Sequence, residues 1–371
     1  MTEVIIHREH CMRPLLDKLL RVILLRMCFF IFFFLGLSIA SEENEACSFA
    51  VPEWGILWEK AHSGDCDAMY ALLSNYWQPG LDQLISHKTG DKSEDEVEQL
   101  KRAAQSGSAD ACYLLAEYFL YVNIDFVKSK SYLEKGAELG NAECMMQVAN
   151  GMLFNEQVLT KEKQIRDLLL RAAKAGKADA YASLALMYLW LGEHGMNKSI
   201  AWEQCEQYLK KADEADSAMA WSVKGDMYIT GMGRINNNKE AIKCYQIGAQ
   251  KGDPKSQYIY GKYCLENPTT AAEGIKLLHK AAAQFHTGSI SIVGFIYLNG
   301  YEVPQDIQKG FLFIQYAAYN GDETAQFQMG QLLYEGKFVA QNKELGLEWI
   351  QKSASQGCPR AIQYLKQLEN L

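Results

Sequence analysis

The chain has 371 residues, of which 49% are hydrophobic, 11% aromatic and 22% charged, and it contains only seven prolines. This composition excludes a disordered chain and provides enough apolar side chains for a large buried core. The formal net charge is -8. Because an acidic surface repels nucleic acid and anionic lipid at long range, we expect no nucleic-acid partner.

The first 40 residues have the pattern of an export signal. An uncharged apolar run, MCFFIFFFLGLSIA at 27–40, follows five basic residues and precedes the segment SEENE. The sequence therefore predicts a signal peptide over 1–40 that is cut after Ala40. The alternative is an uncleaved membrane anchor over 22–40, which would be the only part that contacts the membrane. In both cases we expect 41–371 to be exported, either periplasmic or secreted.

The rest of the chain repeats one pattern, and no sustained run of alternating β-branched residues interrupts it. Each copy is a helical ending followed by a turn residue, as in RAAKAGKADA, KADEADSAMA, IGAQKGDPKS and YAAYNGDETA. The turn residues, 33 to 43 positions apart, are Gly64, Gly107, Gly140, Gly176, Asp216, Gly252, Phe285, Gly321 and Gly357. This spacing is the length of a two-helix unit, so the sequence predicts an all-α fold.

Small residues recur in register after each turn residue. Four positions after it, every copy has Ala, Cys or Ser; nine positions after it come Ala116, Ala149, Ala185, Gly225, Gly261, Gly294 and Gly330. Glycine inside a helix costs about 1 kcal/mol relative to alanine. Glycines in register therefore indicate the close approach of a neighbouring helix.

Larger residues define the two helices of each unit. Val293 and Tyr297 lie on one face with the small residues, which places them in helix A, the helix after the turn residue. Helix A ends at a second turn such as NGYEVPQD at 299–306, where Asp306 is placed to cap the next helix, helix B. The turn glycine then ends helix B in a left-handed conformation.

At these residues the pattern resembles the SEL-one-like repeat (SLR) family, a branch of the tetratricopeptide-like αα solenoids. The repeat positions that match or extend the pattern are Ala180, Ala220, Gly225, Tyr228, Gly252, Gly261, Gly294, Tyr297, Asp306, Gly321, Ala325 and Gly330. The resemblance covers 53–371. It implies a right-handed αα-superhelix of about eight to nine repeats that binds a protein or peptide on its concave surface.

The sequence offers no reactive constellation. The histidines of the predicted exported part lack metal-ligand spacing, and no P-loop, G-x-S-x-G or C-x-x-C pair occurs. The segment GMGRIN at 231–236 follows a helix pattern rather than a strand, so we interpret it as a repeat turn. We predict no catalytic residue, no metal site and no cofactor.

Two further groups of residues carry predictions. Cys244 and Cys264 flank the turn at Gly252 and form the best candidate for a disulfide. Aromatic residues at the edge of the core face either pack between neighbouring A helices or anchor a partner. These candidate partner-binding residues are Tyr70, Tyr113, Tyr121, Trp190, Tyr258 and Phe327.

The favoured hypothesis is a non-catalytic exported scaffold that binds a protein or peptide partner in the bacterial envelope. One version of it is an immunity protein that neutralises a toxin targeted to the periplasm. The alternatives are a membrane-anchored assembly or signalling adaptor and an enzyme that acts on cell-wall material.

Overall fold

The computed structural model describes residues 56–57, 60–61, 63–76, 92–123, 125–154, 158–232 and 234–369. The chain divides into two compact units, Met1–Ala46 and Cys47–Leu371, and all described residues belong to the second. The predicted leader over 1–40 lies outside the described residues. None of the helices in the described ranges has the length and apolarity that a bilayer crossing requires.

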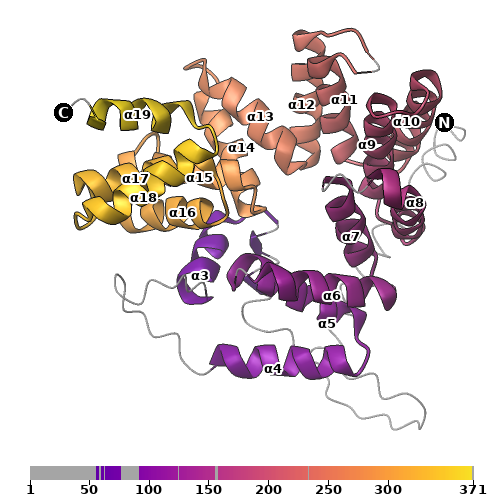
Figure 1. Ribbon diagram of the computed structural model, residues 1–371, viewed down its shortest axis with the longest axis horizontal. Helices are drawn as coiled ribbons and strands as arrows, with labels where there is room; N and C mark the ends of the chain where they lie inside the picture. Colours follow the sequence, from indigo (N-terminus) through magenta and orange to yellow (C-terminus); the bar gives the residue numbers. More distant parts are fainter. Residues whose placement is uncertain are drawn as a thin grey trace, which may run out of the picture. The chain divides into compact units, whose positions relative to one another are not determined.

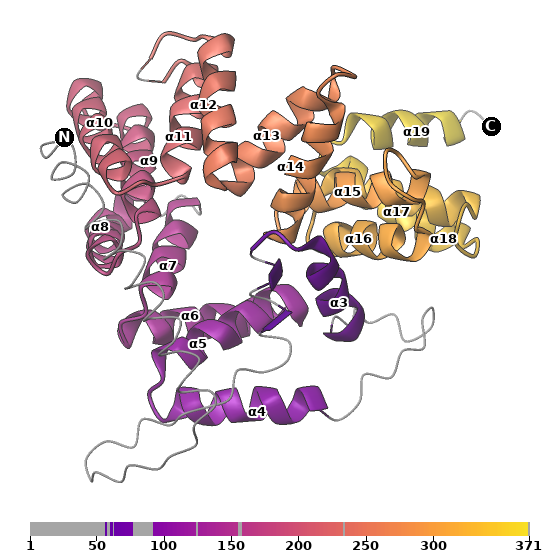
Figure 2. The same ribbon diagram turned by 180° about the vertical axis from the view of Figure 1, so that it is seen from behind.

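Every regular element in the described ranges is a helix (Figures 1 and 2). In chain order they are α3 (Cys66–Tyr76), α4 (Lys92–Gln105), α5 (Ala109–Glu117), the π-helix η1 (Tyr118–Val122), α6 (Phe126–Glu138), α7 (Ala142–Phe154), α8 (Val158–Lys174), α9 (Asp179–Glu193), α10 (Lys198–Glu214), α11 (Met219–Thr230), α12 (Asn238–Lys251), α13 (Pro254–Leu265), α14 (Ala271–Ala283), α15 (Thr287–Asn299), α16 (Ile307–Tyr319), α17 (Glu323–Glu335), α18 (Lys343–Ser355) and α19 (Pro359–Glu369).

The helices pair in sequence order into hairpins. α5 packs on α6, α7 on α8, α9 on α10, α11 on α12, α13 on α14, α15 on α16 and α17 on α18, while α19 packs on α18. Most hairpins also pack their second helix on the first helix of the next hairpin. The prediction of an all-α solenoid of helix-turn-helix repeats is confirmed.

The turn residues have the left-handed conformation that ends helix B. All seven turn glycines have φ between 91° and 101°. At Gly252, the backbone N–H of Asp253 donates to the carbonyl of Gly248 at 3.0 Å, and the Asp253 carboxylate accepts from the Ser256 N–H at 2.7 Å. One turn therefore ends a helix and caps the next. At the second turn, Asp306 caps helix B by accepting from the Lys309 N–H at 2.9 Å.

Two turns reach the same conformation without glycine. Asp216 has φ 62° and Phe285 has φ 60°. Phe285 is buried, and its ring centroid lies 5.0 Å from that of Tyr121 and 6.0 Å from that of Tyr316. A side chain in the left-handed region costs about 1 to 2 kcal/mol. The aromatic contacts of Phe285 offset this cost and join η1 to a much later part of the chain.

The helix glycines mark direct contact between the two helices of one hairpin. A Cβ atom on Gly294 of α15 would lie 2.9 Å from the carbonyl oxygen of Gly310 on α16, and a Cβ on Gly310 would lie 2.8 Å from the carbonyl oxygen of Gly294. Gly330 and Gly346 face each other in the same reciprocal way, with both distances at 2.7 Å. The glycines of helix B were not predicted from the sequence.

A second contact joins repeats that are far apart in the chain. α3 packs on α14 and α16, although a solenoid repeat ordinarily contacts only its neighbours. The Lys309 ammonium on α16 pairs with the Asp67 carboxylate on α3. The Tyr70 ring meets the Phe313 ring edge-to-face, with the centroids 6.2 Å apart. The described part of the chain thus has a packed contact that the repeat itself does not require.

A buried carboxyl group lies immediately before η1. Glu117 is 2% exposed, and the side-chain amide of Gln147 on α7 donates to its Oε1 at 2.9 Å. Burial raises the pKa of Glu117 from 4.5 to about 8, against the opposing effect of the Gln147 hydrogen bond. The group is therefore held largely protonated in the folded chain at neutral pH.

Replacement of the two non-glycine turn residues, Asp216 and Phe285, by glycine should change the free energy of unfolding in opposite directions. We expect Asp216→Gly to raise the free energy of unfolding by about 1 kcal/mol, because it relieves the left-handed strain. Its ion pair with Lys251 is lost, but the Asp216 side chain is 84% exposed and the pair contributes little. Phe285→Gly should lower the free energy of unfolding by about 2 to 4 kcal/mol, because its ring contacts are lost. Urea unfolding measures both, and a stabilising Phe285→Gly would contradict the account of this turn.

Glu117 should make stability depend on pH. Its folded-state pKa of about 8 exceeds the ordinary value of 4.5, so the folded chain keeps a proton that the unfolded chain releases between these values. The contribution of protonated Glu117 to the free energy of unfolding is complete below pH 4.5 and is lost as the pH rises to 8. We expect Glu117→Gln to be more stable than the natural chain by more than about 1 kcal/mol at pH 8, and by much less at pH 4.5. Equal differences at both pH values, measured by denaturant unfolding, would refute this assignment.

Candidate functional site

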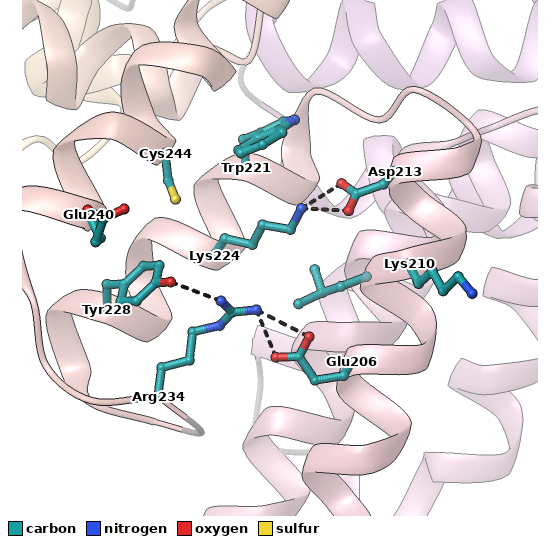
Figure 3. A pocket seen from close by; sticks show the side chains of 10 residues that line it. Glu206, Lys210, Asp213, Trp221, Lys224, Tyr228, Arg234, Glu240 and Cys244 are labelled. Atoms are coloured by element: carbon teal, nitrogen blue, oxygen red, sulfur yellow. Dashed lines mark hydrogen bonds and ion pairs between the residues drawn. The ribbon is translucent and has the colours of Figure 1, made fainter.

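At one junction between hairpins, the second helix of one hairpin makes little contact with the first helix of the next. α10 and α11 touch at few points, and α11 packs mainly on α12 and α9. A cleft of about 330 Å³ lies at this junction (Figure 3). Its lining comes from α10, α11, α12 and the turn between the last two: Glu206, Leu209, Lys210, Asp213, Trp221, Lys224, Tyr228, Arg234, Glu240 and Cys244.

Lys224 is held between a carboxylate and an indole. Its Nζ lies 2.6 Å from both carboxylate oxygens of Asp213 on α10, and 4.2 Å from the centroid of the Trp221 ring. The Lys224 side chain is only 12% exposed. A cation removed from water to this extent needs a counter-ion, and the ring face adds to the attraction. The ammonium group is therefore fixed in one position in the cleft.

Arg234 fixes a second cation beside it. Its Nη2 donates to both oxygens of Glu206 at 2.8 and 3.2 Å, and its Nη1 donates to the Tyr228 hydroxyl at 3.1 Å. The guanidinium carbon lies 5.1 Å from the centroid of the Tyr228 ring. The Nε atom is buried and has no hydrogen-bond partner among the described residues. A buried donor without a partner costs about 1 to 3 kcal/mol.

The cleft contains charges of both signs in equal number. The lining includes the cations Lys210, Lys224 and Arg234 and the anions Glu206, Asp213 and Glu240, so it has no net charge. It offers fixed donors, fixed acceptors and the faces of Trp221 and Tyr228. Such a lining suits a polypeptide segment with both charged side chains and backbone carbonyls.

The groups of the cleft are poorly suited to covalent or metal chemistry. Burial raises the pKa of the Cys244 thiol, and a neutral thiol is a weak nucleophile. No group of three or more His, Cys, Asp or Glu side chains in the described ranges is arranged to hold a metal ion.

The predicted aromatic anchors do not line this cleft. Tyr70 and Tyr121 lie in the contacts between distant repeats, and the Tyr113 hydroxyl is hydrogen-bonded to Glu117. Trp190 is half-buried and stacks on His194, with centroids 3.8 Å apart.

The two remaining aromatic candidates differ in exposure. Tyr258 is half-buried, and its ring centroid lies 4.6 Å from that of His286 and 5.1 Å from the Lys262 ammonium. Phe327 is only 3% exposed and packs edge-to-face on Tyr364. Phe327 is a core residue in this structure, because the last helix covers it, and it has too little exposed surface for an anchor.

The structure contradicts the predicted disulfide. Cys244 and Cys264 are both free thiols. Cys244 lines the cleft beside α11, whereas Cys264 on α13 is hydrogen-bonded to Tyr260 and Thr270 next to α14. The two helices meet at the Gly252 turn, but the two cysteines lie on faces that pack against different neighbours.

The sequence prediction missed the main residues of the cleft. Trp221, Lys224 and Arg234 belong to no motif, and GMGRIN was interpreted only as a turn. Two irregularities of the repeat mark the place: Asp216 replaces the turn glycine, and the interval before it is longer than the usual one.

Stacked two-helix units with left-handed turns define an αα solenoid of the tetratricopeptide-like class. Within this class the Sel1 repeat model matches residues 109–141, 215–253, 254–286, 289–322 and 324–358. The chain is a Sel1-repeat protein. The stretch 142–214 is unmatched, yet the structure places two more hairpins of the same kind there, α7–α8 and α9–α10.

Relatives and solved structures share this repeat. The Sel1-repeat-containing protein YjcO of Escherichia coli K12 is 24% identical over 211 residues, which cover 54% of this chain and 88% of YjcO. The uncharacterized protein NMB1327 of Neisseria meningitidis is 24% identical over 199 residues, or 53% of this chain, and the match spans only 41% of NMB1327.

Two solved crystal structures match most of this chain. A Sel1 repeat protein from Oxalobacter formigenes is 20% identical, with a TM-score of 0.42, over 89% of this chain and 98% of that one. A protective antigen present in uropathogenic Escherichia coli strains, which displays an SLR fold, is 21% identical, with a TM-score of 0.40, over 83% of this chain and 65% of that one. Sel1 repeats generally mediate protein–protein interaction.

Proposed function

We propose that this chain is a non-catalytic exported scaffold that holds a segment of a partner protein in the cleft between α10, α11 and α12. The observation that carries the proposal is the Lys224 ammonium in the cleft lining, which is fixed between the Asp213 carboxylate and the Trp221 ring. A carbonyl or carboxylate of a bound segment would accept a hydrogen bond from the Lys224 ammonium, while the rings of Trp221 and Tyr228 would cover its apolar part.

The predicted export signal supports a more specific version. A positively flanked apolar run precedes the repeats, which is typical of an export signal. An exported binding protein without a reactive group suits the neutralisation of a toxin in the periplasm, and we propose an immunity protein as this version. A membrane-anchored adaptor is the alternative, and cell fractionation distinguishes the two by whether the chain still carries residues 22–40.

The enzyme alternative requires a convergent pair of acidic groups in a pocket. In the cleft, Glu206 and Asp213 are each engaged by a cation, and Glu240 pairs with Lys243 at 2.7 Å. Carboxylates engaged in this way are less available for proton transfer to a substrate. This favours binding over hydrolysis.

The test is the recovery of a partner with matched variants. The tagged full-length chain is expressed in its host, cross-linked in the periplasm and purified, and enriched proteins are identified by mass spectrometry. Trp221→Ala with Lys224→Met removes one cation–aromatic pair from the cleft. We expect it to reduce recovery of the partner at least tenfold, because the anchor and the fixed charge are both lost.

The matched control is Tyr258→Ala with Lys262→Met, which removes a similar pair at an aromatic position predicted from the sequence. We expect this variant to retain the partner. Recovery that falls with the control and not with the cleft variant would place binding at Tyr258 instead. No protein enriched above background would refute the proposed function. Circular dichroism shows whether each variant is folded.

A further inference from the structure

The second candidate surface is the one that α3 covers. α3 is joined to α4 by residues 77–91, yet its main contacts are with α14 and α16, which come much later in the chain. Both views in Figures 1 and 2 show α3 beside these helices and apart from α4. We call the surface formed by His279, Tyr297, Lys309 and Phe313 the α3 seat.

The α3 seat contains a buried cation that lacks an anion of its own. The Lys309 side chain is 8% exposed, and its Nζ lies 4.5 Å from the centroid of the Tyr297 ring. Among the described residues, its ion-pair partner is Asp67 on α3, whose side chain is 86% exposed. A buried ammonium needs a counter-ion, and here the docked helix supplies it. The seat therefore has the charge of a binding site for an acidic ligand.

The α3 helix has the pattern of a groove-binding peptide. Asp67 pairs with Lys309, and three positions later Tyr70 lies 5.5 Å from the same ammonium and packs edge-to-face on Phe313. Met69, Leu72 and Leu73 are fully buried. Spacings of three and four place such residues on one face of a helix, which is how amphipathic helices bind grooves.

We propose that the α3 seat is a helix-binding site for a partner protein, and that α3 is a built-in ligand that the partner helix displaces. The ligand class is an amphipathic helix with a carboxylate three residues before an aromatic side chain. This site is separate from the α10–α12 cleft and does not depend on the function proposed for it.

The chain permits this exchange. The 15 residues of 77–91 reach at most about 50 Å when extended, so α3 can leave its seat while it stays attached. α14 and α16 keep their contacts with α13, α15 and α17 when α3 leaves, and a solenoid repeat is stabilised mainly by such sequence neighbours. A tethered ligand competes at an effective concentration in the millimolar range, which weakens the apparent affinity for a free helix.

The test measures binding of a fluorescent peptide to the full-length chain. The peptide has the sequence of residues 63–76, with Cys66→Ser to prevent oxidation, and fluorescence anisotropy reports its binding. The full-length Asp67→Lys variant should bind this peptide at least tenfold more tightly than the natural chain does, because a like charge beside the Lys309 ammonium weakens the docking of the tethered helix. Adding Lys309→Met to that variant should abolish the gain.

A charge exchange provides the specific control. The full-length chain with Asp67→Lys and Lys309→Glu should bind the natural peptide poorly and a peptide with Asp67→Lys more tightly. The cleft variant Trp221→Ala with Lys224→Met should leave peptide binding unchanged, which separates this proposal from the proposed function.

Three results would overturn the proposal. If α3 is a structural element that the fold requires, the Asp67→Lys chain unfolds, and loss of its helical circular dichroism would show this. Binding that is indifferent to Lys309, or equal for a scrambled peptide, would reduce the seat to an apolar surface. A dimer that the peptide dissociates, detected by light scattering, would assign the seat to a second copy of the chain and not to a partner helix.

Discussion

The fold depends on direct contact between helix backbones. In the last hairpins, a glycine on helix A faces a glycine on helix B, as with Gly330 and Gly346 or Gly294 and Gly310, and each occupies the space that a Cβ on the other would need. This contact brings the two helices together at one point and fixes their mutual position. The left-handed turns then connect each hairpin to the next without extra length.

The two departures from the repeat explain the unusual parts of the molecule. At Asp216 the turn keeps its conformation, but the neighbouring helices α10 and α11 separate, and the charged cleft lies there. At Phe285 a ring replaces glycine and packs on Tyr121 from an early repeat. A strained residue of this kind persists only where the surrounding structure compensates for it. In this solenoid, the two turns without glycine therefore coincide with the cleft and with a contact between distant repeats.

Local features were predictable from the sequence, and features that join distant parts were not. The turn at Gly252 and the cap at Asp306 depend on residues within one turn, and the sequence indicated both. Gly310 was missed because a glycine in helix B is informative only once its partner is known. Lys309 lies in helix B of a repeat, but its pairing with Asp67 follows no repeat period.

The wrong disulfide and the missed cleft have related physical causes. Cys244 and Cys264 were paired by their distance from a turn, although the direction in which a helix face points decides contact. The cleft arises from the space between two helices, which no single residue encodes. Arg234 lies in the segment GMGRIN, which we interpreted from the sequence as a repeat turn. Its position in the cleft depends on Glu206 from the preceding hairpin.

A double-mutant cycle at Gly294 and Gly310 tests the central claim, that these two backbones touch. Each single alanine substitution should lower the free energy of unfolding by about 1 to 3 kcal/mol. The double variant should be less destabilised than the sum, because helices separated by one Cβ already accommodate the other. Gly151→Ala is the control, since no atom outside its own helix backbone and chain neighbours lies within 4 Å of its added Cβ, and it should add independently to Gly294→Ala. Additive losses at Gly294 and Gly310, within about 0.5 kcal/mol, would contradict the account.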